Sequence, residues 1–188
     1  MKNIFLIIVT LSSLYFKAQT YPLNTSPSDI PANGYIKDMN NELNKYVGLW
    51  KGTWDGKTLF LELRKVKYYY GGNDPYYIDK IVGERKVVTA NGTREIDRIT
   101  RFDEKSPEFR GMTISLKNGN WKRLTFYPKN MCRKMASIDI TNFTPTQMTL
   151  HFEYLPSIVE PNCQHNSYVD QNGDFPINFP KDIVLIKQ

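Results

Sequence analysis

The sequence predicts an all-β protein built around a single up-and-down antiparallel barrel of about 8–10 strands, with a short N-terminal helix before it. Apolar and polar side chains alternate through successive segments, which is the period of a strand with one buried face. Asn-Gly and Asp-Gly pairs separate several of these segments, as tight hairpins require. The chain has 188 residues with 40% apolar and 13% aromatic content, enough for one core. A barrel leaves no exposed strand edge, so we prefer it to a sandwich, which the pattern also allows.

The first 45 residues precede the strand pattern. Residues 1–18 combine a basic start, a short apolar run and a cleavage site at Ala18, which is typical of a secretory signal peptide. The apolar run is too short to span a bilayer. Residues 19–45 form a proline-containing arm, and its last part, from Asp38 to Lys45, predicts one or two helical turns. We therefore expect an exported protein, periplasmic or extracellular, without a transmembrane span, whose barrel domain covers residues 46–188.

The strand pattern begins at Tyr46 and continues to the C-terminus. The first expected strand ends at the Asp55-Gly56 turn, and Asn91-Gly92 and Asn118-Gly119 turn two later hairpins. Nine antiparallel strands would leave the first and last parallel, so either the count of nine is wrong or residues 164–170 form a tenth strand. The other strands are expected at residues 57–70, 77–90, 93–102, 112–116, 120–127, 136–140, 148–154 and 182–187.

One face of these strands is apolar and is expected to point into the barrel. These side chains would line an apolar ligand cavity in a hollow barrel, or they would fill the interior, for which their size is equally suited. The inward-facing residues are Trp50, Trp54, Leu59, Leu61, Leu63, Met112, Ile114, Leu116, Met148, Leu150 and Phe152.

Both cysteines, Cys132 and Cys163, lie in the part of the chain expected to be exported. An oxidising compartment favours a disulfide there over a metal site. In the chain-entropy model this loop closure stabilises the fold by about 3.5–4 kcal/mol. Tight connections follow the odd-numbered strands and long ones follow the even-numbered strands, so the long connections are expected at one end of the barrel. That end would hold both cysteines and the connection at residues 70–76.

Two groups of residues at this long-loop end are candidates for ligand contact. The tyrosines surround a glycine-containing connection and suit flat contacts with a sugar, a peptide or a partner protein. The basic residues belong to the segment 110–134, which contains seven Lys and Arg and no acid, and would suit an anionic partner. Cross-strand pairing of the tyrosines and a solvated basic face are the simpler interpretations. The candidates are Tyr69, Tyr70, Tyr76, Tyr77, Lys129, Arg133 and Lys134.

The motif Gly48-Leu49-Trp50, after a short helical segment and before a meander of strands, resembles the Gly-x-Trp signature of lipocalin-like (calycin-like) barrels. The resemblance implies that Trp50 packs across the barrel floor and that the interior often carries a small apolar ligand. The family's later loop motifs are absent from this sequence. The segment from residue 1 to Trp50 is also similar to small exported proteins of Bacteroidota of unknown function, which implies export and a barrel but no activity.

The expected function is an exported binding or interaction protein, with a small apolar molecule or an envelope protein as its partner. Removal of the signal peptide lowers the net charge from +6 to about +4, below that of a dedicated nucleic-acid binder. We expect a monomer with no cofactor and no metal, because the two histidines, His151 and His165, lack ligand spacing. One alternative is an envelope interaction module or inhibitor-like protein that uses the long-loop end. Another is a hydrolase or isomerase that uses His151 and Glu153 without a linear motif.

Overall fold

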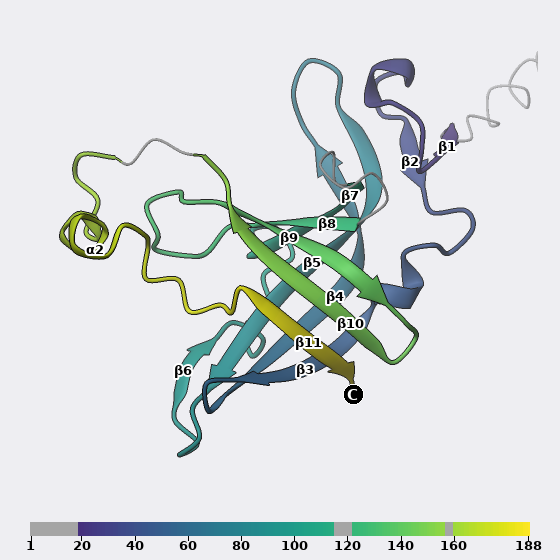
Figure 1. The fold of residues 1–188 in the computed structure, drawn as a ribbon. Coiled ribbons are helices and arrows are strands. Elements are labelled where there is room, and N and C mark those ends of the chain that lie inside the picture. The colour runs from purple at the N-terminus through teal and green to yellow at the C-terminus, as the bar shows by residue number, and fades with distance from the viewer. Residues whose placement is uncertain (1–18, 115–121, 157–159) are drawn as a thin grey trace, which may run out of the picture. The chain divides into compact units, whose positions relative to one another are not determined.

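The computed structural model describes residues 19–114, 122–156 and 160–188, and only the backbone of residues 112–114 (Figure 1). The chain forms two compact units. The smaller unit contains the chain up to Asn40 together with Lys67–Asp79, and the larger contains Asn41–Val66 and Lys80–Gln188. Strands β4 (Lys57–Tyr70) and β5 (Tyr76–Val88) contribute residues to both units. The N-terminal arm therefore forms one compact unit with residues 67–79.

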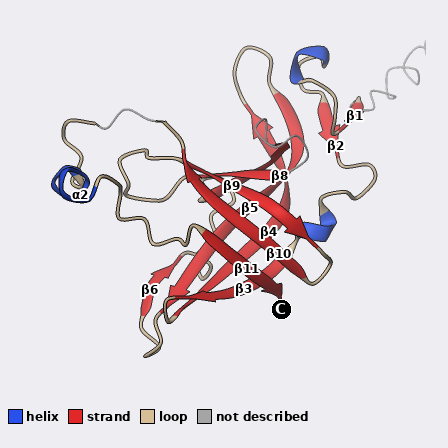
Figure 2. Ribbon diagram, in the orientation of Figure 1, coloured by secondary structure: helices blue, strands red, loops and turns tan. Residues whose placement is uncertain are grey.

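The larger unit is a closed antiparallel barrel of eight strands, which confirms the predicted all-β class (Figure 2). Each strand pairs with the next barrel strand along the chain, and the β11–β3 and β5–β7 pairings close the circle. Besides β4 and β5, the barrel strands are β3 (Gly48–Trp54), β7 (Phe109–Ile114), β8 (Lys122–Phe126), β9 (Ala136–Phe143), β10 (Gln147–Tyr154) and β11 (Asp182–Lys187). Asp55 and Gly56 both have positive φ, 46° and 71°, as the predicted tight turn between β3 and β4 requires.

Three elements differ from the sequence prediction. The strand expected at residues 93–102 is only β6 (Arg94–Asp97), which pairs with β5 and lies off the barrel path. The candidate strand at residues 164–170 is helical, because α2 (Asn166–Asn172) occupies it and ends at Gly173, whose φ is 73°. The helix expected from Asp38 to Lys45 is reduced to one 3₁₀ turn, η2 (Asn44–Tyr46).

Because β6 is not a barrel strand, the order of tight and long connections reverses after it. Gln147 lies opposite Ile186, which lies opposite Lys51, so the turn before β10 is at the end of the barrel where β3 begins. The Asp55-Gly56 turn follows β3 at the other end. Both turns follow odd-numbered strands in the predicted order of nine, which would place them at the same end, and that prediction is wrong. The argument that grouped the connection at residues 70–76 with the cysteines fails for the same reason.

Aromatic side chains pack at both ends of the barrel. Where β3 begins, the ring centroids of Tyr46 and Phe143 are 4.8 Å apart, and those of Trp50 and Phe143 are 6.0 Å apart. At the opposite end Phe179 packs against Phe126 at 5.5 Å, and the same cluster includes Phe109 and Phe152. We call the first the Trp50 end and the second the disulfide end.

The smaller unit adds two short parallel strands to the tip of the β4–β5 hairpin. β1 (Thr20–Pro22) pairs with β2 (Tyr35–Lys37), and β2 pairs with β5 through Tyr77 and Ile78. A 3₁₀ turn, η1 (Pro27–Asp29), lies between β1 and β2. Ile36 is fully buried and forms the centre of this packing. None of the helices in the described ranges is long and apolar enough to cross a membrane.

Candidate functional site

The main candidate site is the tyrosine hairpin, which we define as residues 67–79 in the smaller unit. Successive residues of a strand point to opposite faces, so its tyrosines divide into two sets. On the first face the rings of Tyr70 and Tyr76 are stacked, with centroids 5.0 Å apart and planes 16° apart. Tyr68 meets Tyr70 edge-on at 5.0 Å with a 61° interplanar angle. We call Tyr68, Tyr70 and Tyr76 the stacked face.

The opposite face of the hairpin is built around Lys67. Its Nζ lies 4.4 Å from the ring centroid of Tyr35 and 4.3 Å from that of Tyr77, a cation–π contact with two rings. Tyr69 packs against Tyr77 at 5.1 Å. This set, which we call the lysine face, joins β2 to the hairpin.

Asp79 anchors the N-terminal arm to the lysine face. The Tyr35 hydroxyl donates to Asp79 Oδ1 at 2.5 Å, and the Asp38 backbone N–H donates to Asp79 Oδ2 at 2.9 Å. Burial raises the pKa of Tyr35 well above its ordinary value, and its hydrogen bond to the Asp79 carboxylate raises it further. Tyr35 therefore acts as a hydrogen-bond donor, and the arm holds the lysine face in place.

The hairpin exposes aromatic surface despite these contacts. Tyr69 is 52% exposed and Tyr70 is 38% exposed, while Tyr76 and Tyr77 are half-buried. Burial raises the pKa of Tyr76, with a smaller contribution from Tyr70, so its hydroxyl stays protonated. The structure thus brings together all four predicted tyrosines as a pre-packed aromatic surface.

The three predicted basic residues belong to the larger unit, whereas the four tyrosines belong to the smaller one. The ammonium group of Lys129 donates to the Ser106 side chain at 2.8 Å and to its carbonyl oxygen, and is part of the loop packing. Lys134 lies over the rings of Tyr154 and Phe175, at 4.9 and 5.3 Å. Arg133, whose side chain is 91% exposed, is 3.5 Å from Glu160. These contacts divide the basic residues among separate local partners.

The predicted disulfide joins Cys132 to Cys163, with Cα atoms 5.7 Å apart. It connects the segment after β8 with the segment after β10. Both segments leave the barrel at the disulfide end, because Phe126 and Tyr154 lie opposite the same residue, Ala136. The Gln164 amide also donates to the carbonyl oxygen of Asn130 at 3.1 Å. The bridge therefore links two connections that leave the barrel at this end.

The barrel interior is filled at the positions that the structure describes. A cavity that could hold water or a ligand would leave exposed surface on the side chains that line it. Trp50 has no exposed surface, Phe152 is 8% exposed and Trp54 is half-buried. Leu116 and the side chains of Met112 and Ile114 lie outside the described residues. The interior side chains without exposed surface include Leu59, Leu61, Leu63, Leu124, Phe126, Ile138, Met148 and Leu150.

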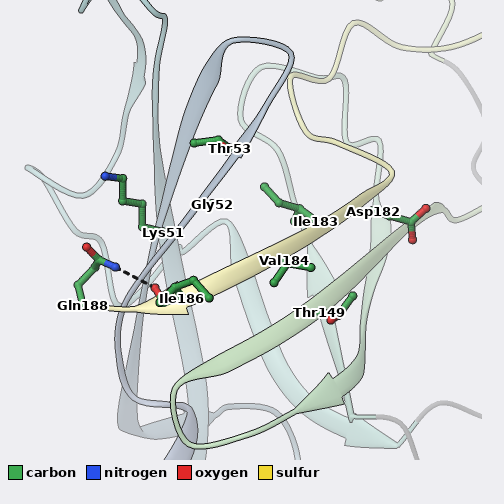
Figure 3. Close-up of a pocket in the computed structure, with 9 residues that line it drawn as sticks. All are labelled: Lys51, Gly52, Thr53, Thr149, Asp182, Ile183, Val184, Ile186 and Gln188. Atoms are coloured by element: carbon green, nitrogen blue, oxygen red, sulfur yellow. Dashed lines mark hydrogen bonds between the residues drawn. The ribbon is translucent and has the colours of Figure 1, made fainter.

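An open depression lies on the outer surface of β3, β10 and β11 (Figure 3). Val184 and Ile186, each 46% exposed, contribute its apolar surface. Asp182 lies at its edge and is 2.6 Å from His151 Nδ1. His151 and Glu153 do not themselves line the depression, so the pocket expected for a hydrolase or isomerase gains no support. In the ranges that the structure describes, no group of three or more His, Cys, Asp and Glu side chains could hold a metal ion.

Sequence reasoning missed Tyr35, Lys67 and Asp79, which organise the lysine face. Tyr35 belongs to a three-residue strand in a proline-containing arm, too short for a periodic pattern. Lys67 is 32 positions away in the sequence, and its spacing to Tyr35 carries no signal. It also missed Asp182 as the partner of His151, because the two become neighbours only through the β10–β11 register.

Comparison with known proteins gives a family but no activity. No curated protein and no solved structure matches the chain. A family model covers all of it, from residue 1 to residue 188. The chain therefore belongs to the family described as "Family of unknown function (DUF6705)".

Proposed function

We propose that this protein is an exported binding protein that holds a macromolecular partner through the tyrosine hairpin. The observation that carries the proposal is the exposure of Tyr69 and Tyr70 on a hairpin whose rings already pack against one another. Tyrosine rings offer large contact area at a low entropic cost, because two torsions fix them. Rings held by their neighbours before binding reduce that cost further.

Two further observations support this role over that of a small-molecule carrier. The interior side chains in the described ranges are buried, whereas a carrier of the lipocalin kind needs an open cavity. The buried ion pair of Arg85 and Glu108 also lies at the disulfide end. An apolar ligand buried there would remove hydrogen bonds that these charges make and could not replace them. We therefore propose that the protein resembles lipocalin-like barrels in its fold, and we do not propose that it carries an apolar ligand as they do.

Export is supported by the disulfide and by the signal-like pattern of residues 1–18. A bridge between Cys132 and Cys163 persists in an oxidising compartment and is reduced in the cytosol. The partner is accordingly expected among the molecules of the cell envelope or the external medium.

The test is partner capture by the immobilised mature protein from an envelope extract of its host. Wild type is compared with a Tyr69→Ala/Tyr70→Ala variant and with Tyr168→Ala, a matched control because Tyr168 is 45% exposed but lies on α2 in the larger unit. Wild type and Tyr168→Ala should retain the same partner in stoichiometric amounts, and the double variant should lose it. Equal capture by all three proteins contradicts the proposal. A small molecule released at one per chain on denaturation would favour the carrier function instead.

A further inference from the structure

We propose that residue 19 of the mature chain is a pyroglutamate, formed when the side chain of Gln19 cyclises onto its own α-amino group. The proposal rests on the export proposed above, because a cut after Ala18 makes Gln19 the first residue of the mature chain. The modification replaces the terminal ammonium group by a neutral lactam. It also gives a chemical role to a neighbouring side chain, Tyr21.

Cyclisation needs only the groups that an N-terminal glutamine carries. An α-amino group is partly unprotonated near neutral pH, and in that form it can attack the side-chain amide carbon, Cδ. The new bond between the nitrogen and Cδ closes an unstrained five-membered ring. The bond between Cδ and Nε2 breaks, and Nε2 leaves as ammonia with the proton that the amine loses. The reaction consumes no oxidant or other co-reactant, and the chain becomes lighter by one ammonia molecule.

The Tyr21 hydroxyl group is placed to promote this reaction. It donates a hydrogen bond to Oε1 of Gln19 at 2.5 Å. Negative charge develops on this oxygen when the amine attacks Cδ, and a donor already bound to the oxygen stabilises that charge. Tyr21 is half-buried, and a Cβ atom added at Gly34 would lie 3.4 Å from its Cε2 atom. The packing of its ring against the backbone of Gly34 therefore positions the hydroxyl group.

The backbone at Gln19 accommodates the modified residue. Gln19 is exposed, and β1 begins at the next residue, Thr20. The backbone carbonyl oxygen of Gln19 accepts a hydrogen bond from the Tyr35 N–H at 3.1 Å. Cyclisation removes Nε2 and keeps both carbonyl oxygens of Gln19. Neither the bond from Tyr35 nor the bond from Tyr21 therefore depends on a group that the reaction removes.

The lactam would protect the N-terminal arm from aminopeptidases, which require a free α-amino group. β1 has only three residues, and its first residue, Thr20, pairs with Tyr35 of β2. Loss of Gln19 and Thr20 would remove this pairing and the carbonyl group that the Tyr35 N–H uses. Tyr35 in turn donates to Asp79, which anchors the arm to the lysine face. A blocked N-terminus therefore preserves the contacts that hold the tyrosine hairpin.

The first experiment is mass spectrometry of the intact protein purified from its host, followed by sequencing of its N-terminal peptide. The chain should begin at residue 19 and be lighter by one ammonia molecule than residues 19–188 with the disulfide formed. The N-terminal peptide should carry the whole loss, which separates cyclisation from deamidation elsewhere. Gln19→Ala is the matched control, and it should begin at residue 19 with its full mass and a free amino group.

The second experiment tests Tyr21 on the full mature chain, released from an N-terminal tag with Gln19 uncyclised. Loss of ammonia is followed by mass spectrometry in buffer and in urea. Tyr21→Phe should cyclise about 2- to 13-fold more slowly than wild type in buffer, because it lacks one hydrogen bond to the reacting amide. The two proteins should cyclise at the same rate in urea, where the fold no longer positions the hydroxyl group.

The outcomes separate this proposal from the function on which it rests. A chain that begins at residue 19 with its full mass overturns the modification and leaves export intact. A chain that begins at a different residue after the leader overturns both the modification and the predicted cleavage site. A chain that retains residues 1–18 contradicts export and therefore the proposed function as well. Equal rates for wild type and Tyr21→Phe in buffer overturn the role of Tyr21.

Discussion

The indole Nε1 of Trp50 donates a hydrogen bond to the backbone carbonyl oxygen of Tyr46 across 2.8 Å. The bond joins β3 to the 3₁₀ turn that precedes it, and Trp50 has no exposed surface. Lys187 Nζ lies 5.2 Å from the centroid of the same indole, so the last strand also contacts this residue. Trp50 therefore connects the first barrel strand, β3, with the last, β11, and with the 3₁₀ turn η2.

Replacing Trp50 by Phe should lower the free energy of unfolding by about 1–3 kcal/mol, because the Tyr46 carbonyl group loses its buried donor. Urea unfolding monitored by circular dichroism measures the change. Trp54→Phe is the matched control, since Trp54 is on the same strand but only half-buried. Equal effects of the two substitutions would show that the Trp50 hydrogen bond does not contribute to stability.

The Cys132–Cys163 disulfide should contribute strongly to the free energy of unfolding. The free energy of unfolding of the Cys132→Ser/Cys163→Ser variant should be lower than that of wild type by about 2–5 kcal/mol. Without the bridge, the unfolded chain gains conformational entropy. Reductant should destabilise the wild type to the same extent and leave the variant unchanged. A wild-type protein whose stability is insensitive to reduction would contradict this prediction.

Local patterns predicted the barrel strands well, and they failed where tertiary contacts decide the structure. Leu59, Leu61 and Leu63 alternate with Phe60, Glu62 and Arg64, and a period of two residues is typical of a strand with one buried face. Residues 94–97 contain a single apolar side chain, Ile96, so no pattern shows that this strand is short and off the barrel. That one error reversed the connection order for the rest of the chain.

The candidate site was predicted in part for a related reason. Tyrosines on both sides of a glycine-containing turn identified the hairpin, because adjacent residues in sequence become neighbours in space. The division into a stacked face and a lysine face depends on Tyr35, which the chain brings to the hairpin from a distant segment. A contact between segments without periodicity leaves no signal in a single sequence.

The buried ion pair at the disulfide end gives a third prediction. Arg85 Nε donates to Glu108 Oε2 at 3.0 Å, and the two side chains are 3% and 2% exposed. Arg85→Met should lower the free energy of unfolding by about 3–5 kcal/mol, because it leaves a buried carboxylate without its cation. Adding Glu108→Met should restore much of this loss. The Lys129 N–H, which donates to Glu108 Oε1, would still lack an acceptor, so recovery should be incomplete.

Urea unfolding of the two single variants and the double variant gives the coupling energy between Arg85 and Glu108. Additive effects would show that the two charges stabilise the fold independently, and would contradict the coupling that their 3.0 Å contact predicts.

The last prediction concerns Glu84, whose side chain is fully buried on β5. Burial raises the pKa of this carboxyl above its ordinary value of 4.5, and the nearby Glu108 raises it too. Arg98, at 3.4 Å, opposes the shift, and Glu84 Oε2 has no hydrogen-bond partner. The folded state therefore binds the Glu84 proton more tightly than the unfolded state. Its contribution is fully present below the ordinary pKa and is lost as pH rises through the raised pKa.

Glu84→Gln cannot ionise, so its stability relative to wild type should increase as pH rises from about 4 to about 8. Glu84→Gln also loses the ion pair with Arg98. This loss lowers the free energy of unfolding by an amount that is nearly independent of pH once Glu84 is ionised in the wild type. Urea unfolding at several pH values measures the difference, and Glu104→Gln, at a carboxylate that is 53% exposed, controls for the removal of one charge. A stability difference between Glu84→Gln and wild type that does not change with pH would mean that burial does not control the ionisation of Glu84.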